Sequence, residues 1–406
     1  MRKTLRILIV SQYFPPEIGA PQNRLLGMAQ TLQQEGHEVE VLTAMPNYPE
    51  MRVHDGFRGK LFHRHVVNEV SVVRSWIYAS PNKSFVRRLA NYFSFVFSSL
   101  LGALGTKQCD IVYCESPPLF LGISGWLIAV LKRARFVFNI SDLWPETAEK
   151  LGIVKNQAIL GVCYRLEAFL YQRTVLVSGQ TQGIVRSISR RYPDVPTIWI
   201  PNGVDWHLYE GKSGNPYGSA SSKLKTFVYA GVLGYAQGLE VILEAARHLD
   251  ERTDIRFEII GDGPERESLQ SMADGLGDRV SFVAPMSKGE VIDRITGAYG
   301  YIVPLRKLDL FRGAIPSKLF DALALGIPIL LGVDGEAREL FIEEAGAGIY
   351  YEPENGTALA EGILRLADSV VLRDTLGEKG RRYARDRFDR RRISRALVER
   401  LSSVDR

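Results

Sequence analysis

The sequence predicts an α/β protein of two Rossmann-like, doubly wound domains that face each other across a cleft. Short apolar runs rich in β-branched residues alternate with helix-length segments along the chain. One stretch dense in Gly and Ser interrupts this alternation, and 406 residues is a length typical of two domains. Because ligands bind at the carboxyl ends of strands in such sheets, two facing sheets direct their ligand loops into one cleft.

The first domain is expected to span residues 1–205. A helix is predicted at residues 23–34, because Leu25, Leu26, Ala29 and Leu32 fall on one helical face and Gly36 follows as a stop signal. Apolar runs predict strands at residues 5–10, 38–42, 111–114, 135–139, 175–177 and 197–200.

The second domain is expected to span residues 206–385, with residues 210–223 as a Gly- and Ser-rich linker or surface loop. Strands are predicted at residues 226–230, 256–260, 279–283, 300–303 and 328–331. Helices are predicted at residues 239–249, 264–272, 288–296 and 316–325. The Arg-rich segment 381–395 is predicted to be a solvated helix.

Composition excludes several classes of protein. With 46% hydrophobic and 24% charged residues, the chain is neither disordered nor collagen-like. Its three cysteines have no C-x-x-C spacing, which argues against a disulfide framework or a zinc site and fits a reducing cytoplasm. Residues 1–200 carry 23 Lys and Arg against 14 Asp and Glu, whereas the rest carries 28 against 32. The basic first half indicates an anionic surface or substrate.

Two loops of the first half are candidate ligand-binding loops. After the first strand, Gly19 permits a close backbone approach to a ligand, and Asn23 and Arg24 open the following helix. The alternative is an ordinary Pro-rich loop with Arg24 solvated. After the fourth predicted strand, Asp142 with Trp144 suits a carbohydrate, although Asp142 is equally an N-cap for a following helix.

The second half repeats a pattern of strand, glycine loop and helix. Candidate ligand contacts are Gly231, Gly234, Gly261, Asp262, Gly263, Pro304 and Leu305. In the later segment 312–322, Arg312 and Ser317 accompany Lys318 at a predicted helix start, where the helix dipole disfavours a cation. A bound phosphate would explain Lys318. The alternatives are a Lys that reaches solvent or pairs with Asp321.

Taken together, the I-P-N-G-V-D turn, the G-D-G-P-E loop and the P-S-K-L-F-D-A-L-A-L-G-I-P segment resemble the retaining glycosyltransferases of family four, which have the GT-B fold. The N-I-S-D-L-W-P-E segment is most similar to bacterial O-antigen and capsule transferases, including L-fucosamine transferases. The resemblance implies a nucleoside diphosphate sugar donor, retention of anomeric configuration and no metal or other cofactor. It also implies that residues 386–406 form a helix that crosses back to the first domain.

The resemblance further implies residue roles. Residues 261–263 with Pro304 and Leu305 would face the nucleobase, Asp321 would bind the ribose, and the Gly19 loop would close over the diphosphate and donor sugar. The chain departs from the family at Gly313, Val232 and Gln237, where an acidic residue and the phosphate-binding Arg and Lys are expected. We therefore expect Lys318, with Arg312, to supply much of the missing positive charge.

The expected catalytic residues are Lys318, Asp142 and Glu17. Lys318 would stabilise the departing diphosphate without a metal, since no D-x-D motif is present. Asp142 and Glu17 would orient the acceptor or stabilise the oxocarbenium character of the sugar.

The acceptor is expected to be a polyprenyl-diphosphate-linked saccharide. The segment 85–104 is aromatic and Leu-rich and has Arg87, Arg88 and Lys107 near its ends, which is typical of a helix lying on an anionic membrane surface. A buried core helix is the alternative. The protein is thus expected to be cytoplasmic, peripheral on the inner face of the plasma membrane, with the first domain facing the acceptor and with no nucleic-acid partner. The competing functions are a UDP-sugar epimerase of the same fold and a non-catalytic nucleotide-sugar-binding protein.

Overall fold

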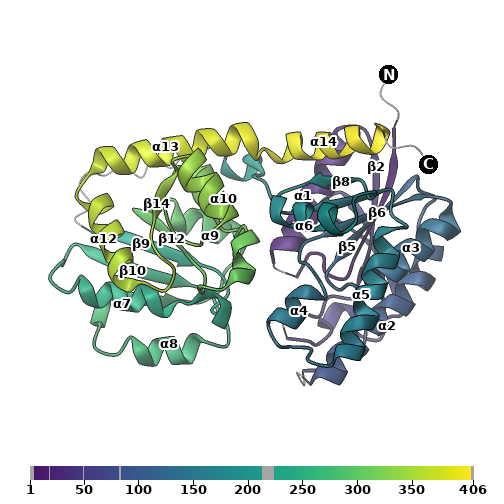
Figure 1. The fold of residues 1–406 in the computed structure, drawn as a ribbon, viewed down its shortest axis with the longest axis horizontal. Helices are drawn as coiled ribbons and strands as arrows, with labels where there is room; N and C mark the ends of the chain where they lie inside the picture. The colour runs from purple at the N-terminus through teal and green to yellow at the C-terminus, as the bar shows by residue number, and fades with distance from the viewer. Residues whose placement is uncertain (1–3, 18, 49, 82–83, 213–223, 404–406) are drawn as a thin grey trace. The chain divides into compact units, whose positions relative to one another are not determined.

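The computed structural model describes residues 4–17, 19–48, 50–81, 84–212 and 224–403. The chain divides into two compact units (Figure 1). The first unit comprises Met1–Pro201 together with Arg390–Arg406, and the second comprises Asn202–Asp389. Most of the predicted linker, residues 213–223, lies outside the described residues.

The first unit contains an eight-stranded sheet in the order β3-β4-β2-β1-β5-β6-β7-β8. Its neighbouring strands are parallel except for the hairpin of β3 and β4. The strands are β1 Arg6–Ser11, β2 Glu38–Ala44, β3 Phe62–Val67, β4 Val70–Ser75, β5 Ile111–Ser116, β6 Arg135–Ile140, β7 Leu176–Gly179 and β8 Thr197–Trp199.

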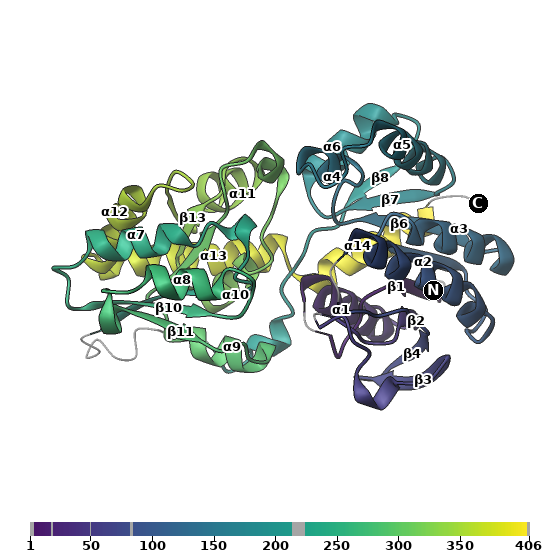
Figure 2. The same cartoon turned by 90° about the horizontal axis from the view of Figure 1, so that it is seen from below.

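Helices cover both faces of this sheet. The helices are α1 Ala20–Gln34, α2 Phe85–Leu104, α3 Leu121–Lys132, α4 Glu146–Lys150, α5 Gln157–Tyr171, α6 Gln182–Arg191 and α14 Arg390–Ser403. Leu25 and Leu32 of α1 share one core with Leu397 of α14, whereas α2, α3, α5 and α6 contribute to the core on the other face (Figure 2). Arg395 of α14 forms a 2.6 Å ion pair with Glu35, so the C-terminal helix is held on α1.

The second unit contains a six-stranded parallel sheet in the order β11-β10-β9-β12-β13-β14. The strands are β9 Lys225–Ala230, β10 Ile255–Ile260, β11 Val280–Val283, β12 Gly300–Pro304, β13 Ile329–Gly332 and β14 Gly348–Tyr350. The helices are α7 Glu240–His248, α8 Arg266–Met272, α9 Lys288–Ile295, α10 Leu319–Leu325, α11 Glu336–Arg338, α12 Gly356–Ala367 and α13 Val370–Arg387. The prediction of two doubly wound, Rossmann-like sheets is confirmed.

The hairpin of β3 and β4 is absent from the sequence prediction. Its strands are joined by Asn68 and Glu69, both with positive φ (44° and 69°), as a tight hairpin turn requires. Because the usual Asn-Gly or Asp-Gly pair is not present, the turn carries no strong sequence signal. β3 is also an edge strand that is exposed or half-buried throughout, so it lacks an apolar run.

Candidate functional site

In the second unit, two glycine loops lie against each other beyond the ends of β9 and β10. The N–H of Leu233 donates to the carbonyl of Asp262 at 2.8 Å. A Cβ on Gly261, whose φ is +137°, would overlap the carbonyl oxygen of Gly231, and a Cβ on Gly263 would overlap that of Leu233. Glycine is therefore required at both positions for the backbones of the two loops to pack against each other. Gly234 lies in the same loop, where a Cβ would make only an ordinary 3.6 Å contact with the side chain of Val232.

Lys318 extends into this loop pair. Its Nζ donates to Oε1 of Gln237 at 2.9 Å and lies 3.9 Å from the centroid of the Tyr229 ring. A Cβ on Gly231 would come within 3.0 Å of the same Nζ. Among the described residues, Lys318 forms no ion pair. The ammonium group is thus held by a neutral amide and an aromatic face beside the glycine loop.

Burial lowers the pKa of Lys318 to about 7. The cause is desolvation, which disfavours the charged ammonium form where no carboxylate compensates for lost hydration. A bound phosphate would supply that compensation, so the arrangement is suited to an anion.

The alternative in which Lys318 pairs with Asp321 is wrong. Helix α10 begins at Leu319 rather than at residue 316, so Ser317 and Lys318 precede the helix. Asp321 instead forms a short ion pair with Lys288 of α9 and accepts a 2.5 Å hydrogen bond from the hydroxyl of Tyr209. If Asp321 binds the ribose, as the resemblance implies, its carboxylate must exchange these two contacts for the ribose hydroxyls.

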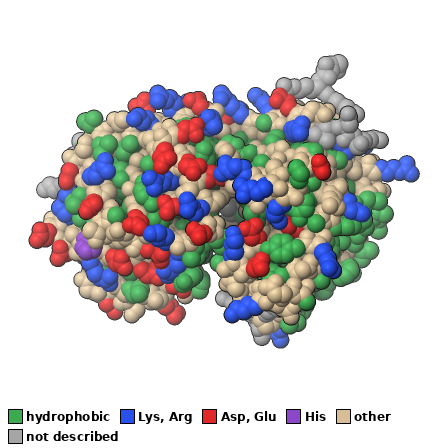
Figure 3. Space-filling model, viewed as in Figure 1, with side chains coloured by type: hydrophobic (Ala, Val, Ile, Leu, Met, Phe, Trp, Pro, Cys, Tyr) green, Lys and Arg blue, Asp and Glu red, His purple; other side chains and the backbone are tan. Residues whose placement is uncertain are grey.

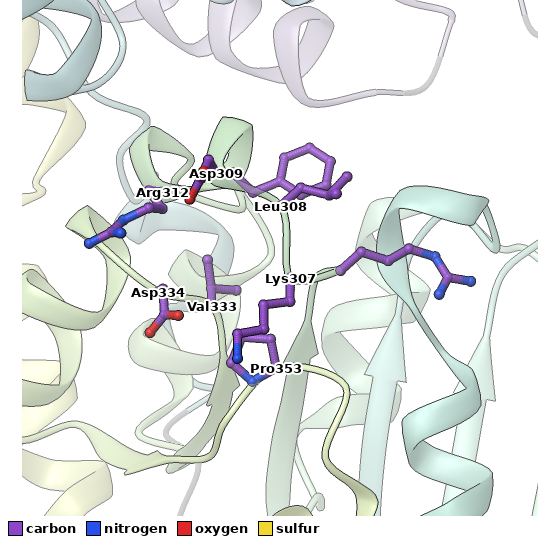
Figure 4. A pocket seen from close by; sticks show the side chains of 9 residues that line it. Lys307, Leu308, Asp309, Arg312, Val333, Asp334 and Pro353 are labelled. Atoms are coloured by element: carbon purple, nitrogen blue, oxygen red, sulfur yellow. The ribbon is translucent and has the colours of Figure 1, made fainter. Parts of the chain in front are cut away.

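Arg312 lines a pocket beyond β12 and β13 (Figure 4). It belongs to the 3-10 turn η6, Asp309–Gly313, and its side chain is exposed and forms no ion pair with a described residue. Asp334 of the same pocket is engaged, because it accepts a 2.7 Å hydrogen bond from the hydroxyl of Tyr350. Pro304 and Leu305, at the end of β12, are buried, so any contact of theirs with a ligand would be through backbone groups.

Arg306 is a site residue that sequence analysis missed. Its Nε donates to the carbonyl of Tyr235 at 2.8 Å, and its guanidinium stacks over the Tyr235 ring at 4.2 Å. Its guanidinium also forms ion pairs with Glu240 at 2.6 Å and with Glu354 at 2.9 Å. Arg306 thus fixes the loop that carries Gln237, and only long-range contacts reveal this.

In the first unit, Glu17 organises the loop after β1. The residue is 2% exposed, and its carboxylate accepts backbone hydrogen bonds from Asn47 and Tyr48, both at 2.8 Å, and from Phe14 at 3.3 Å. Burial raises the pKa of Glu17 to about 7. The carboxylate therefore joins the loops after β1 and β2.

The same loop leads into α1, which begins at Ala20, three residues earlier than predicted. The carbonyl of Gly19 accepts from the N–H of Asn23 at 3.1 Å, so the backbone of Gly19 starts the helical hydrogen-bonding pattern. A Cβ on Gly19 would overlap the amide of Gln22, a flexible side chain.

Arg24 is not solvated, so that alternative is wrong. It is 2% exposed, and its Nη2 forms a 2.6 Å ion pair with Glu115 at the end of β5. Asn139 donates to the other carboxylate oxygen of Glu115 at 2.8 Å, and Ser141 accepts from Arg24 at 3.2 Å. Arg24 thus anchors α1 to the carboxyl ends of β5 and β6, and no local pattern marks Glu115 as its partner.

Asp142 does not cap a helix. Pro145 occupies the N-cap of α4, and Asp142 instead accepts a 2.6 Å hydrogen bond from the hydroxyl of Thr147. Burial raises the pKa of Asp142. Trp144 packs partly against the core, next to Leu143.

Helix α2 has one buried face and one exposed apolar face. Asn91, Phe95 and Ser99 are fully buried, whereas Phe97 and Leu101 are more than 60% exposed. No described helix is at once long and apolar enough to cross a bilayer. Nor do the described His, Cys, Asp and Glu residues form a cluster of three that could hold a metal ion.

Two family descriptions match almost the whole chain. "Glycosyl transferase 4-like domain" matches residues 19–203, and "Glycosyl transferases group 1" matches residues 218–383. The chain therefore belongs to the group 1 glycosyltransferases, and it is an enzyme of that class with the GT-B fold.

Its relatives include bacterial proteins that are named as glycosyltransferases. The chain is 24% identical over 408 residues to "Putative colanic acid biosynthesis glycosyl transferase WcaI" of Escherichia coli, covering 97% of this chain and 99% of that protein. It is 25% identical to "Probable glycosyltransferase WbjE" of Pseudomonas aeruginosa, covering 73% and 74%.

Solved structures share the fold. The sucrose-phosphate synthase of Thermosynechococcus elongatus superposes with a TM-score of 0.74 at 17% identity, covering 98% of both chains. HepE of Anabaena, determined in complex with UDP-glucose, superposes with a TM-score of 0.71 at 17% identity, covering 98% of this chain and 100% of HepE.

Proposed function

We propose that the protein is a retaining glycosyltransferase that moves a sugar from a UDP-sugar to a polyprenyl-diphosphate-linked saccharide in O-antigen or capsule synthesis. The name of WcaI, which refers to colanic acid biosynthesis, supports a role in polysaccharide synthesis, and the HepE complex supports a UDP-sugar donor. The proposed sugar is N-acetyl-L-fucosamine. The observation that carries the proposal is Lys318, a desolvated cation beside a glycine loop with no carboxylate partner among the described residues.

Lys318 is proposed to stabilise the departing UDP. Cleavage of the bond between sugar and phosphate develops negative charge on the diphosphate, and a cation already held in place lowers the barrier without reorganisation. Among the described residues, Lys318 donates a hydrogen bond only to Gln237. Its other N–H groups are therefore available to phosphate oxygens. Exposed Arg312 is the second proposed cation.

Retention is proposed to proceed by front-side attack, in which the departing phosphate oxygen takes the proton from the acceptor hydroxyl. Asp142 and Glu17 are proposed to orient the acceptor or to stabilise the positively charged sugar. Asp142 suits this role better, because the carboxylate of Glu17 accepts from backbone N–H groups of the loops that it joins, at Phe14, Asn47 and Tyr48.

The enzyme is proposed to be peripheral on the inner face of the plasma membrane. Exposed apolar side chains continue from α2 onto α3 and α5, and Figure 3 shows hydrophobic side chains gathered over this side of the first unit. Exposed basic residues accompany them, which matches an anionic bilayer. The apolar members are Val86, Phe97, Leu101, Leu104, Val130, Leu131, Ile159 and Val162.

A panel of nucleotide-sugars tests the donor proposal. With a lipid-linked saccharide as acceptor, we expect UDP release that depends on the acceptor, together with a product whose anomeric configuration by NMR matches that of the donor. Conversion of the UDP-sugar into its epimer without an acceptor would favour the epimerase. UDP binding with no turnover would favour a non-catalytic protein, and an inverted product would refute retention.

Vesicle co-sedimentation tests the membrane proposal. Leu101→Asp is expected to reduce binding to vesicles of phosphatidylglycerol, whereas Val371→Asp, at a 77% exposed position of the second unit, is the matched control. Equal binding of both variants would contradict the proposed surface.

A further inference from the structure

Four aromatic side chains lie at the carboxyl ends of three neighbouring strands of the first unit. Tyr13 follows β1, Tyr48 follows β2, and Trp76 and Tyr78 follow β4, and these strands are adjacent in the sheet (Figure 2). Tyr48, Trp76 and Tyr78 are 38%, 42% and 36% exposed. The rings of Tyr13 and Tyr48 meet edge to face at 5.6 Å. We call these four residues the aromatic edge.

Buried amides connect the members of the aromatic edge. Gln12 donates from Nε2 to Oδ1 of Asn91 at 2.7 Å and to the hydroxyl of Tyr13 at 3.3 Å. Asn91 donates in turn to the carbonyl of Tyr78 at 2.6 Å. Gln12 and Asn91 are almost completely buried, and Oε1 of Gln12 accepts no hydrogen bond from the described residues.

Helix α2 holds the later part of the aromatic edge in place. Ser94 accepts from the N–H of Tyr78 at 2.8 Å, and Ser98 donates to the carbonyl of Trp76. Ile77, between the two aromatic residues, is 1% exposed, so the segment is anchored in the core between them. The exposure of Trp76 and Tyr78 is therefore fixed by the backbone.

Exposed aromatic faces suit a carbohydrate, because a sugar ring stacks on them. The carboxyl edge of a parallel sheet is also where such a protein binds its ligands. Asn91 and Ser94, which bond to the aromatic edge, belong to α2, the helix that bears the exposed Phe97 and Leu101.

We propose that the aromatic edge, backed by Gln12 and Asn91, binds the saccharide end of the acceptor. This inference rests on the proposed function and assigns residues to its acceptor side. Stacking on Tyr48 and Tyr78 would hold the sugar, while the apolar face of α2 would contact the lipid.

Saturation-transfer difference NMR tests the proposal. The probes are disaccharides ending in glucose, galactose, N-acetylglucosamine or fucose, each at millimolar concentration with the full-length protein. We expect binding of at least one disaccharide, and about tenfold weaker binding for Tyr48→Ala and Tyr78→Ala. Tyr48→Phe, which keeps the ring, and Phe62→Ala, at an exposed aromatic position of β3, are expected to bind as the wild type does.

The outcomes separate the two proposals. Calorimetry with UDP is expected to give the same affinity for all variants, which also shows that they are folded. Binding of no disaccharide by the wild type, or equal binding by the two alanine variants, would overturn the acceptor site. A wild type that binds a disaccharide but no UDP would instead refute the proposed function.

Discussion

Replacing Lys318 with Met is expected to stabilise the free protein while it abolishes tight UDP binding. Met keeps the length and the apolar stem of Lys and removes the charge. A Lys that served only the fold would stabilise it, so its loss would lower stability. A desolvated Lys that serves to bind an anion destabilises the free protein, so its loss would raise stability.

The magnitude follows from the pKa of Lys318, which burial lowers from 10.5 to about 7. Because the folded pKa is below the unfolded one, protonated Lys318 destabilises the native state. At 1.36 kcal/mol for each pH unit, the full penalty below pH 7 is about 5 kcal/mol, and it disappears as the pH rises toward 10.5. The gain in stability from Lys318→Met should therefore be largest below pH 7 and small at pH 10.

UDP binding should show the complementary pH dependence. Above pH 7 the free protein must take up a proton at Lys318 to hold the diphosphate, so the wild-type Kd should rise about tenfold for each pH unit until the pKa of the bound state is reached. Calorimetry between pH 7 and 8.5 measures this slope, and urea denaturation at pH 6 and 9 measures stability. A Lys318→Met protein that is less stable than the wild type and binds UDP equally well would refute the reasoning.

Three other substitutions test the structure. Gly261→Ala should lower the free energy of unfolding by more than about 2 kcal/mol, because its Cβ would overlap the Gly231 carbonyl. The control Gly277→Ala, at φ +53° with open space around it, should lower it by about 1 kcal/mol. Equal urea midpoints for the two variants would contradict this. Arg24→Met should cost about 3–5 kcal/mol in the same assay, since it leaves the carboxylate of Glu115 buried without its cation; a change below 1 kcal/mol would count against the pair. Burial raises the pKa of Glu17 from 4.5 to about 7, so the free energy of unfolding of the wild type should fall by about 3 kcal/mol as the pH rises through that range. Glu17→Gln should remove this pH dependence, and a dependence that persists in the variant would point to another group.

The fold class was predictable because each sheet is built from short apolar strands that local sequence marks clearly. β1, β5, β6, β10 and β12 all occur where apolar runs predict them. The β3–β4 hairpin was not predictable, since it depends on two non-glycine residues at positive φ and on an exposed edge strand.

Local sequence marks several positions of the candidate site but not the contacts that these residues make. Lys318 was identified from its place before a helix, whereas its actual partner, Gln237, is 81 residues away along the chain. A spacing of three residues left Asp321 open as an alternative to a bound phosphate, but Lys318 donates to Gln237. Lys288, 33 residues distant, pairs with Asp321 instead. Such pairings depend on the tertiary fold, which a local pattern does not encode.

The return of α14 to the first unit has a consequence for biosynthesis. Since Arg390–Arg406 belong to the same unit as Met1–Pro201, the second unit is inserted within the first. During translation, α1 and β1 leave the ribosome long before Leu397 and Leu401, which complete their hydrophobic core, are synthesised. The second unit can therefore finish folding while the first still exposes an apolar face, and this interval is where chaperone assistance or aggregation would act.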